Sequence, residues 1–197
     1  MPTLDDLLAI GDRAFRAKWP SGEPLDPAQR ERVEALLRLT HDNLHDDRLN
    51  PQHTELTCSF AYPHAGKMHT IKAKIDRVDE APGGYRVVDY KTGRASKNLI
   101  EPDKKDMQFG IYALALRAFA NDGRWEGIDP PAGGAEYWVL ATGERGRVSF
   151  DELAEYEPKL REKIDKAIEG MLAGDYPRKP NGCDGTCAFL DPGLETG

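Results

Sequence analysis

Near the N-terminus, apolar side chains recur at the three- and four-residue spacing of amphipathic helices. A first helix is predicted over residues 4–18, ending before Trp19-Pro20, because the residue that precedes a proline avoids the helical conformation. A second helix is predicted to begin at Asp26-Pro27, since aspartate caps helix N-termini and proline fits the first turn. The chain therefore opens with two predicted helices.

After these helices the apolar spacing changes to two, which is typical of half-buried strands. Strands are predicted over residues 54–60, 68–78 and 85–91. Pro82-Gly83-Gly84 separates the last two strands and allows a tight reversal of the backbone. These two strands should therefore form a hairpin.

Helical spacing returns in the remainder of the chain. Helices are predicted over residues 103–120 and 151–172, with a strand over 135–141 and a short partner strand over 148–150. Strands enclosed by helices at both ends of the chain indicate an α/β or α+β domain, with a central mixed β-sheet flanked by helices.

Length and composition agree with one globular domain. The 197 residues, 39% of them hydrophobic, can bury a core without disulfide or metal crosslinks. No segment approaches the roughly 20 apolar residues of a membrane helix, and the N-terminus lacks the features of a signal peptide. We therefore expect a cytoplasmic protein with no membrane partner. Its expected parts are N-terminal helices (1–50), a core (51–175) and a C-terminal tail (176–197).

The formal net charge of -7 argues against binding of nucleic acid by bulk charge alone. The charge is nevertheless uneven along the chain. Residues 66–117 contain eleven basic and seven acidic side chains, so this segment is +4 and the remainder is -11. The middle of the chain is therefore the place to look for an anionic partner.

Two aspartates and a lysine in this middle segment form the candidate site. Asp89 and Lys91 project to the same face of an extended strand, about 6.6 Å apart, because side chains alternate. Asp76, at the end of the preceding predicted strand, should meet Asp89 across the hairpin. Facing carboxylates repel unless a cation or proton lies between them. A hard divalent ion such as Mg²⁺ or Mn²⁺ would account for the pair, and the Lys91 ammonium could then stabilise charge on a phosphate.

A structural reading of the same residues stays open. Asp76 and Asp89 can be strand-end carboxylates, and Lys91 can be a solvated lysine that closes an ion pair. The context favours the site: Asp89 follows an apolar run, and the turn Thr92-Gly93 directly follows Lys91, where a sheet opens at its edge.

These motifs resemble the RecB-like and AddB-like exonuclease branch of the PD-(D/E)XK nuclease superfamily. The resemblance rests on three runs: Ile75-Asp76-Arg77-Val78-Asp79, Val87-Val88-Asp89-Tyr90-Lys91-Thr92-Gly93 and Gln108-Phe109-Gly110-Ile111-Tyr112. It implies a restriction-endonuclease-like core. It also implies a Mg²⁺ or Mn²⁺ ion held by Asp76, Asp89 and the backbone carbonyl of Tyr90, with Lys91, Gln108 and Tyr112 as further catalytic residues.

The spacing of Gln108 and Tyr112 independently predicts that their side chains are neighbours. They are four residues apart, which makes them neighbours on one helix face. The alternative is that Tyr112 is a core aromatic with a hydrated hydroxyl and Gln108 a surface residue.

DNA is the expected partner. Arg77, Thr92, Arg94 and Lys97 flank the proposed metal site and could contact phosphates, the Thr92-Gly93 turn through its backbone amides. Lys104 and Lys105 could equally lie on a solvated face, balanced by neighbouring aspartates.

The three cysteines do not indicate a cofactor. Cys183 and Cys187 faintly resemble the iron-sulfur attachment of some relatives, but a cluster needs four thiolates. Cys58, in a predicted strand, is most simply a core residue. An iron-sulfur cluster is therefore not expected.

Together these features predict a metal-dependent DNA nuclease, by resemblance an exonuclease of DNA repair or recombination. The alternative is a catalytically inactive nuclease-fold module that binds DNA or a helicase partner. It is favoured by one departure from the family: an upstream helix there carries a glycine and, four residues later, a histidine, whereas here Gly11 is followed at that offset by Phe15.

Overall fold

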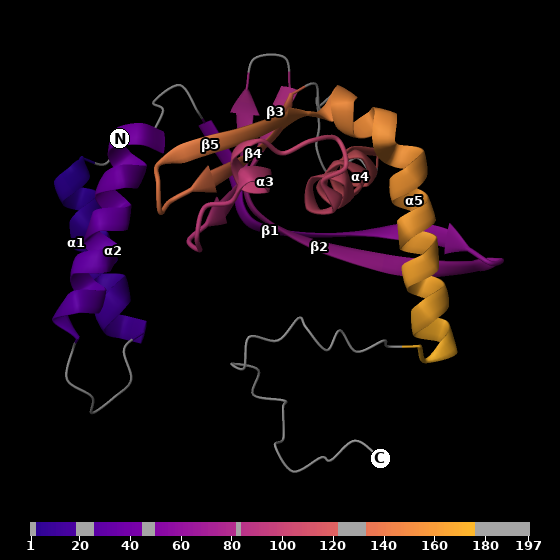
Figure 1. Ribbon diagram of the computed structural model, residues 1–197, viewed down its shortest axis with the longest axis horizontal. Helices are drawn as coiled ribbons and strands as arrows, with labels where there is room; N and C mark the ends of the chain where they lie inside the picture. Colours follow the sequence, from indigo (N-terminus) through magenta and orange to yellow (C-terminus); the bar gives the residue numbers. More distant parts are fainter. Residues whose placement is uncertain (1–2, 19–25, 45–49, 82–83, 122–132, 176–197) are drawn as a thin grey trace, which may run out of the picture. The chain divides into compact units, whose positions relative to one another are not determined.

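The computed structural model describes residues 3–18, 26–44, 50–81, 84–121 and 133–175 (Figure 1). The chain divides into two compact units, residues 1–160 and 161–197. The first unit contains the whole β-sheet and all the candidate site residues. The predicted tail, residues 176–197, lies outside the described residues, and so do Cys183 and Cys187.

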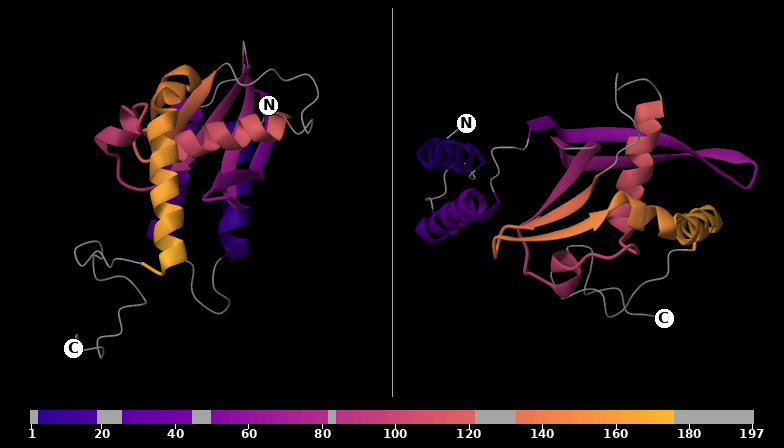
Figure 2. Two further views of the ribbon diagram at one scale, coloured as in Figure 1. Left: turned by 90° about the vertical axis from the view of Figure 1, so that its right-hand side faces the viewer. Right: turned by 90° about the horizontal axis from the view of Figure 1, so that it is seen from above.

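The centre of the first unit is a five-stranded mixed sheet with strand order β1-β2-β3-β4-β5. Neighbouring strands are antiparallel except β3 and β4, which are parallel. The strands are β1 (Asn50–His64), β2 (Lys67–Ala81), β3 (Gly84–Lys91), β4 (Gly134–Val139) and β5 (Glu144–Ser149). Helices flank this sheet, which confirms the predicted α+β class with a restriction-endonuclease-like core. The β1–β2 hairpin is longer than its predicted strands, and Figure 2 shows it extending past helix α4.

The four predicted helices occur in the predicted order, one of them with a later start, and two short elements, η1 and α3, were not predicted. They are α1 (Leu4–Lys18), α2 (Pro27–Leu39), the π-helical turn η1 (Thr40–Leu44), α3 (Lys97–Ile100), α4 (Met107–Asn121) and α5 (Phe150–Ala173). As predicted, Asp26 caps α2, its Oδ1 accepting the Ala28 N–H at 2.9 Å. The helix predicted from residue 103 begins only at Met107. Asp103 and Asp106 instead accept backbone N–H groups of Lys105 and Phe109, and such local bonds favour turns and caps over a helix interior.

Helix α4 provides the core on one face of the sheet. Phe109 is fully buried and stacks on Tyr137 of β4, with ring centroids 4.0 Å apart. On its other side, Gly110 lets the first half of α5 approach, since a Cβ there would lie 2.6 Å from Leu160 Cδ2. A second cluster, Leu44 of η1 with Val88 and Trp138, is buried apart from α4. The sheet is thus covered by apolar side chains over β3 and β4, where the candidate site lies.

Gly146 of β5 offers a test of how the segment after β3 packs on the sheet. A Cβ at this position would overlap the Leu99 carbonyl and lie 2.7 Å from Pro102 Cδ. We expect Gly146→Ala to lower the free energy of unfolding by about 1–3 kcal/mol, the usual cost of overpacking. Urea unfolding measures this. Gly93→Ala is the matched control, because nothing lies within 4 Å of a Cβ there; an equal loss in both variants would contradict the packing.

Candidate functional site

The site forms where β2 and β3 separate. The antiparallel register pairs Arg77 with Val88, so Asp76 comes opposite Asp89 just beyond the last paired residues. Asp76 Oδ2 accepts the backbone N–H of Tyr90 at 2.9 Å. The sequence predicted that Asp76 ends its strand, but β2 continues to Ala81. It marks instead the end of the β2–β3 pairing, and its carboxylate takes over one backbone donor that the ladder leaves unused.

Asp89 is the most enclosed of the site residues, only 3% exposed. Its Oδ1 accepts a hydrogen bond from Gln108 Nε2 at 2.5 Å and lies 3.2 Å from the Tyr112 hydroxyl. Its Oδ2 is fully buried, with Lys91 Nζ 2.5 Å away as an ion-pair partner. The structure therefore brings Asp89, Lys91, Gln108 and Tyr112 into one cluster, with Asp76 beside it.

The Gln108 side chain connects this cluster. Its amide nitrogen donates to Asp89 and to the Tyr112 hydroxyl oxygen (2.8 Å), while its Oε1 accepts from Lys91 Nζ (3.0 Å). Because the two ends of the amide face groups of opposite hydrogen-bonding character, the amide has only one satisfactory orientation. Tyr112 extends the network across the sheet, since its hydroxyl donates to the Lys74 carbonyl oxygen at 2.9 Å.

Burial and charge shift the titration of two groups in the site. Burial raises the pKa of the Asp89 carboxyl, the hydrogen bond and charge of Lys91 oppose that rise, and the charge of Asp76 adds to it. Asp76 is thus near enough to Asp89 to act on it electrostatically. Burial also raises the pKa of Tyr112 to about 12, so at neutral pH this hydroxyl keeps its proton and can donate it in a hydrogen bond.

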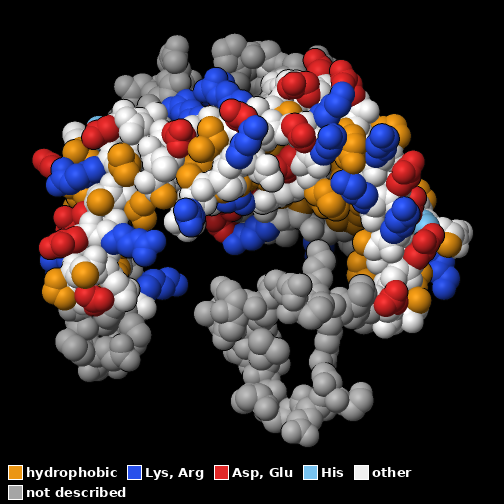
Figure 3. All heavy atoms as spheres, in the orientation of Figure 1, with side chains coloured by type: hydrophobic (Ala, Val, Ile, Leu, Met, Phe, Trp, Pro, Cys, Tyr) orange, Lys and Arg blue, Asp and Glu red, His pale blue; other side chains and the backbone are white. Residues whose placement is uncertain are grey.

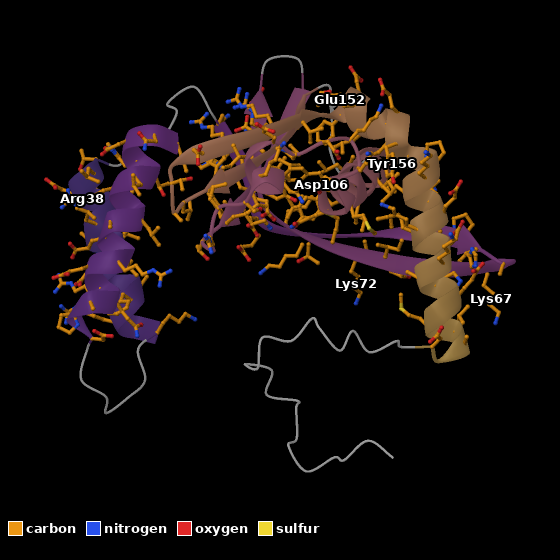
Figure 4. All side chains as sticks on the ribbon, viewed as in Figure 1. Arg38, Lys67, Lys72, Asp106, Glu152 and Tyr156 are labelled. Carbon is orange, nitrogen blue, oxygen red and sulfur yellow. The ribbon has the colours of Figure 1, made fainter. Side chains whose placement is uncertain are left out.

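Two further residues complete the cluster and were not found from the sequence. The Tyr137 ring lies beneath Lys91, with Nζ 4.9 Å from its centroid. Its hydroxyl donates to Asp106 Oδ2 at 3.0 Å and lies 3.3 Å from Gln108 Oε1. Asp106, which is labelled in Figure 4, also accepts the Phe109 N–H at the start of α4. The parallel register that places Tyr137 next to Asp89 would have identified it, but β3 and β4 are 42 residues apart in the chain and their pairing has no local sequence signal.

Arg77 does not join this cluster. Its Nε bonds the buried Asp79 at 2.6 Å, its Nη1 lies 3.3 Å from the Tyr90 hydroxyl, and its guanidinium lies 5.1 Å from the Trp138 ring centre. These partners occupy the face of the sheet opposite Asp89 and Lys91, because side chains alternate along β3. The structure therefore gives Arg77 a place in a buried ionic contact.

The other predicted DNA-contacting residues lie in the segment after β3. Thr92 and Arg94 are exposed, and Lys97 at the start of α3 is exposed with its Nζ 3.7 Å from Glu101. This segment follows Lys91 directly, so the chain leaves the site through an open stretch with two basic side chains.

The donors available to a metal ion are oxygens. Among the residues that the structure describes, no group of three or more His, Cys, Asp or Glu side chains is placed to hold a metal. The candidate ligands are therefore the two carboxylates of Asp76 and Asp89, with the Tyr90 carbonyl implied by resemblance. Cys58 is buried in β1. No helix among the described residues is long and apolar enough to cross a bilayer.

Comparisons with known proteins identify the family. The search of curated proteins found no match. A solved structure titled "Crystal structure of SSO0001" matches with 17% identity and a TM-score of 0.41, over 78% of this chain and 64% of that one. This chain thus spans less than two thirds of that protein. The family model of the PD-(D/E)XK nuclease superfamily matches residues 2–191. The chain, matched over almost its whole length, belongs to the PD-(D/E)XK nuclease superfamily.

Proposed function

We propose that this chain is a divalent-metal-dependent deoxyribonuclease that hydrolyses phosphodiester bonds as an exonuclease in DNA repair or recombination. One observation carries the proposal: Asp89, Lys91, Gln108 and Tyr112 meet in one hydrogen-bonded cluster, with Asp76 facing it. Membership of a nuclease superfamily supports hydrolysis of nucleic acid. The resemblance of the three motifs to RecB-like and AddB-like enzymes supports the exonuclease role.

The donor set fits a hard cation. Asp89 Oδ2 is buried and has the Lys91 ammonium beside it as an ion-pair partner. Burial raises the pKa of Asp89 and the charge of Asp76 adds to that rise, and a cation between the two carboxylates would relieve both effects. Mg²⁺ and Mn²⁺ take oxygen ligands, commonly one or two carboxylates together with waters and substrate phosphate. Asp76, Asp89 and the Tyr90 carbonyl would hold the ion. When bound, such an ion polarises a phosphoryl oxygen and lowers the pKa of a coordinated water.

Lys91 is the residue placed to act on the phosphate. Its ammonium is positioned by Asp89, by Gln108 and by the face of the Tyr137 ring, so it needs little reorganisation to stabilise charge that develops on a phosphoryl oxygen. Gln108 and Tyr112 act through Asp89. Gln108 donates to Asp89 Oδ1, the Tyr112 hydroxyl lies beside that oxygen, and Oδ2 is left toward Lys91.

DNA is the proposed partner, bound through exposed groups next to the site. On the face that Figure 3 shows, acidic and basic side chains are interspersed, so attraction of a polyanion there depends on local groups. Thr92, Arg94 and Lys97 supply such groups on the segment after Lys91. A helicase or another repair protein is proposed as a further partner by resemblance.

The second candidate function is a nuclease-fold module that binds DNA without cutting it. The observation that favours it is the small ligand set: the part of the chain that the structure describes offers no third carboxylate or histidine grouped with Asp76 and Asp89. Hydrolysis assays separate the two functions.

The direct test is cleavage of end-labelled single- and double-stranded DNA with Mg²⁺ or Mn²⁺. Lys91→Ala should lower the rate by about 10²–10³-fold, since it removes a positioned cation from the developing charge. Lys159→Ala, on the exposed side of α5, is the matched control and should cut at the unaltered rate. Products released from the ends of the labelled strand identify an exonuclease. Absence of metal-dependent cleavage, or cleavage that survives Lys91→Ala, would contradict the assignment.

The raised pKa of Asp89 gives a test without substrate. Because folding raises this pKa, the contribution of the carboxyl to stability is complete below the unfolded-state pKa and is lost as the pH rises through the folded-state pKa. In metal-free buffer, the free energy of unfolding of the chain should therefore fall relative to that of Asp89→Asn over this interval.

Urea unfolding of both proteins across the acidic range measures the difference. Adding Mn²⁺ should reverse the trend for the native chain alone, because a bound cation favours the charged carboxyl. If the difference in free energy of unfolding between the native chain and Asp89→Asn depended on neither pH nor Mn²⁺, Asp89 would neither titrate as the geometry requires nor bind the ion.

A further inference from the structure

The β1–β2 hairpin is unusual for an acidic protein. No Asp or Glu occurs from Leu56 to Ile75, whereas Lys67, Lys72 and Lys74 do, in a chain of net charge -7. The hairpin turn lies at Ala65 and Gly66, both with positive φ. Its second strand, β2, runs directly from this turn to Asp76 of the candidate site.

Burial decides which way the lysines of this hairpin point. One set of alternate residues is buried: Cys58, Phe60 and Tyr62 on β1, with Ala73 and Ile75 on β2. Lys72 and Lys74 belong to the other set and are exposed. A register slip would bury both ammonium groups, so the apolar set holds the lysines on the outer face. Figure 4 shows the Lys72 side chain projecting from β2, below the β1–β2 hairpin in that view.

The side chains directly opposite the two lysines are small and uncharged. The residue opposite Lys74 is Thr57, and the residue opposite Lys72 is Ser59. Such side chains leave room for a chain of phosphates to lie along the strand, and their hydroxyls can donate to phosphate oxygens. Lys74 is paired with Glu55, but both side chains are more than 60% exposed. An ion pair as open to water as this one contributes little and can be exchanged for a phosphate.

Spacing links these lysines to the site. Lys72, Lys74 and Asp76 are alternate residues of β2, so neighbouring members of this series are about 6.6 Å apart. This is comparable with the spacing of successive phosphates along an extended nucleic-acid strand. The Tyr112 hydroxyl, which lies 3.2 Å from Asp89, also donates to the Lys74 carbonyl, so the backbone of the lysine strand is tied to the cluster.

We propose that the outer face of the β1–β2 hairpin is a binding track for the nucleic-acid backbone, in which Lys74 and Lys72 contact successive phosphates next to the one at Asp76 and Asp89. The proposal rests on the proposed function, because it assigns the path of the same substrate. The contacts are with phosphates, so the track binds independently of base sequence.

The test is the salt dependence of binding of the full chain to a fluorescent single-stranded oligonucleotide, with Ca²⁺ in place of Mg²⁺. Each phosphate contact to a single strand adds about 0.7 to the slope of log affinity against log salt, so Lys72→Ala/Lys74→Ala should reduce this slope by about 1.4. Lys72→Arg/Lys74→Arg keeps both charges and should keep the slope. Lys18→Ala/Lys159→Ala, two exposed lysines outside the site and the hairpin, removes the same charge elsewhere and should also leave the slope unaltered.

Four results would overturn the track. An unaltered slope in Lys72→Ala/Lys74→Ala, while the native chain binds and cleaves DNA, would reject the binding track without affecting the proposed nuclease function. An equal reduction in Lys18→Ala/Lys159→Ala would assign the effect to net charge. A reduced slope in the arginine variant would assign it to altered packing of the hairpin. A native chain that neither binds nor cleaves DNA would overturn the proposed function together with the track. Thermal unfolding of each variant confirms that the hairpin remains folded.

Discussion

The burial of one carboxylate, that of Asp89, governs the arrangement around it. A charged group removed from water is tolerated only when hydrogen bonds and an opposite charge replace its hydration. Here an amide and a lysine provide the main replacement, and a tyrosine hydroxyl lies beside them. The same enclosure keeps the electrostatic interactions within the site strong, because the local dielectric is low. Burial of this carboxylate therefore costs stability but strengthens its electrostatic interactions, and the surrounding polar side chains offset the cost.

The topology of the sheet explains how side chains so distant in sequence meet at this point. The parallel pairing of β3 with β4 requires a crossover connection, and α4 lies in it. The crossover helix lies on the face of β3 that carries Asp89 and Lys91, and brings Gln108 and Tyr112 to them. The strand that follows adds Tyr137 beneath Lys91. The parallel pairing of β3 and β4, with the helix between them, thus brings together four side chains: Asp89, Lys91, Gln108 and Tyr137.

Residue patterns along the chain predicted the local part of this arrangement. Alternating apolar residues located the strands, and the two-residue spacing of Asp89 and Lys91 placed them on one face. The four-residue spacing of Gln108 and Tyr112 placed them together on a helix. Features that depend on pairing between distant segments were not predictable. Tyr137 belongs to the site only because of the β3–β4 register, and Arg77 points away because Asp79 and Tyr90 bind it on the opposite face. Membership of the PD-(D/E)XK nuclease superfamily was confirmed; the RecB-like and AddB-like branch and the roles of the individual site residues remain proposals.

Asp106 contacts both the start of α4 and the aromatic ring beneath Lys91. It accepts the Phe109 N–H in the first turn of α4 and the Tyr137 hydroxyl, which lies 3.3 Å from Gln108 Oε1, so it holds the turn that carries Gln108. Fraying of this turn would release Gln108 and hydrate Asp89 in the same event. Order at this one helix end therefore bears directly on how Gln108 and Asp89 are held.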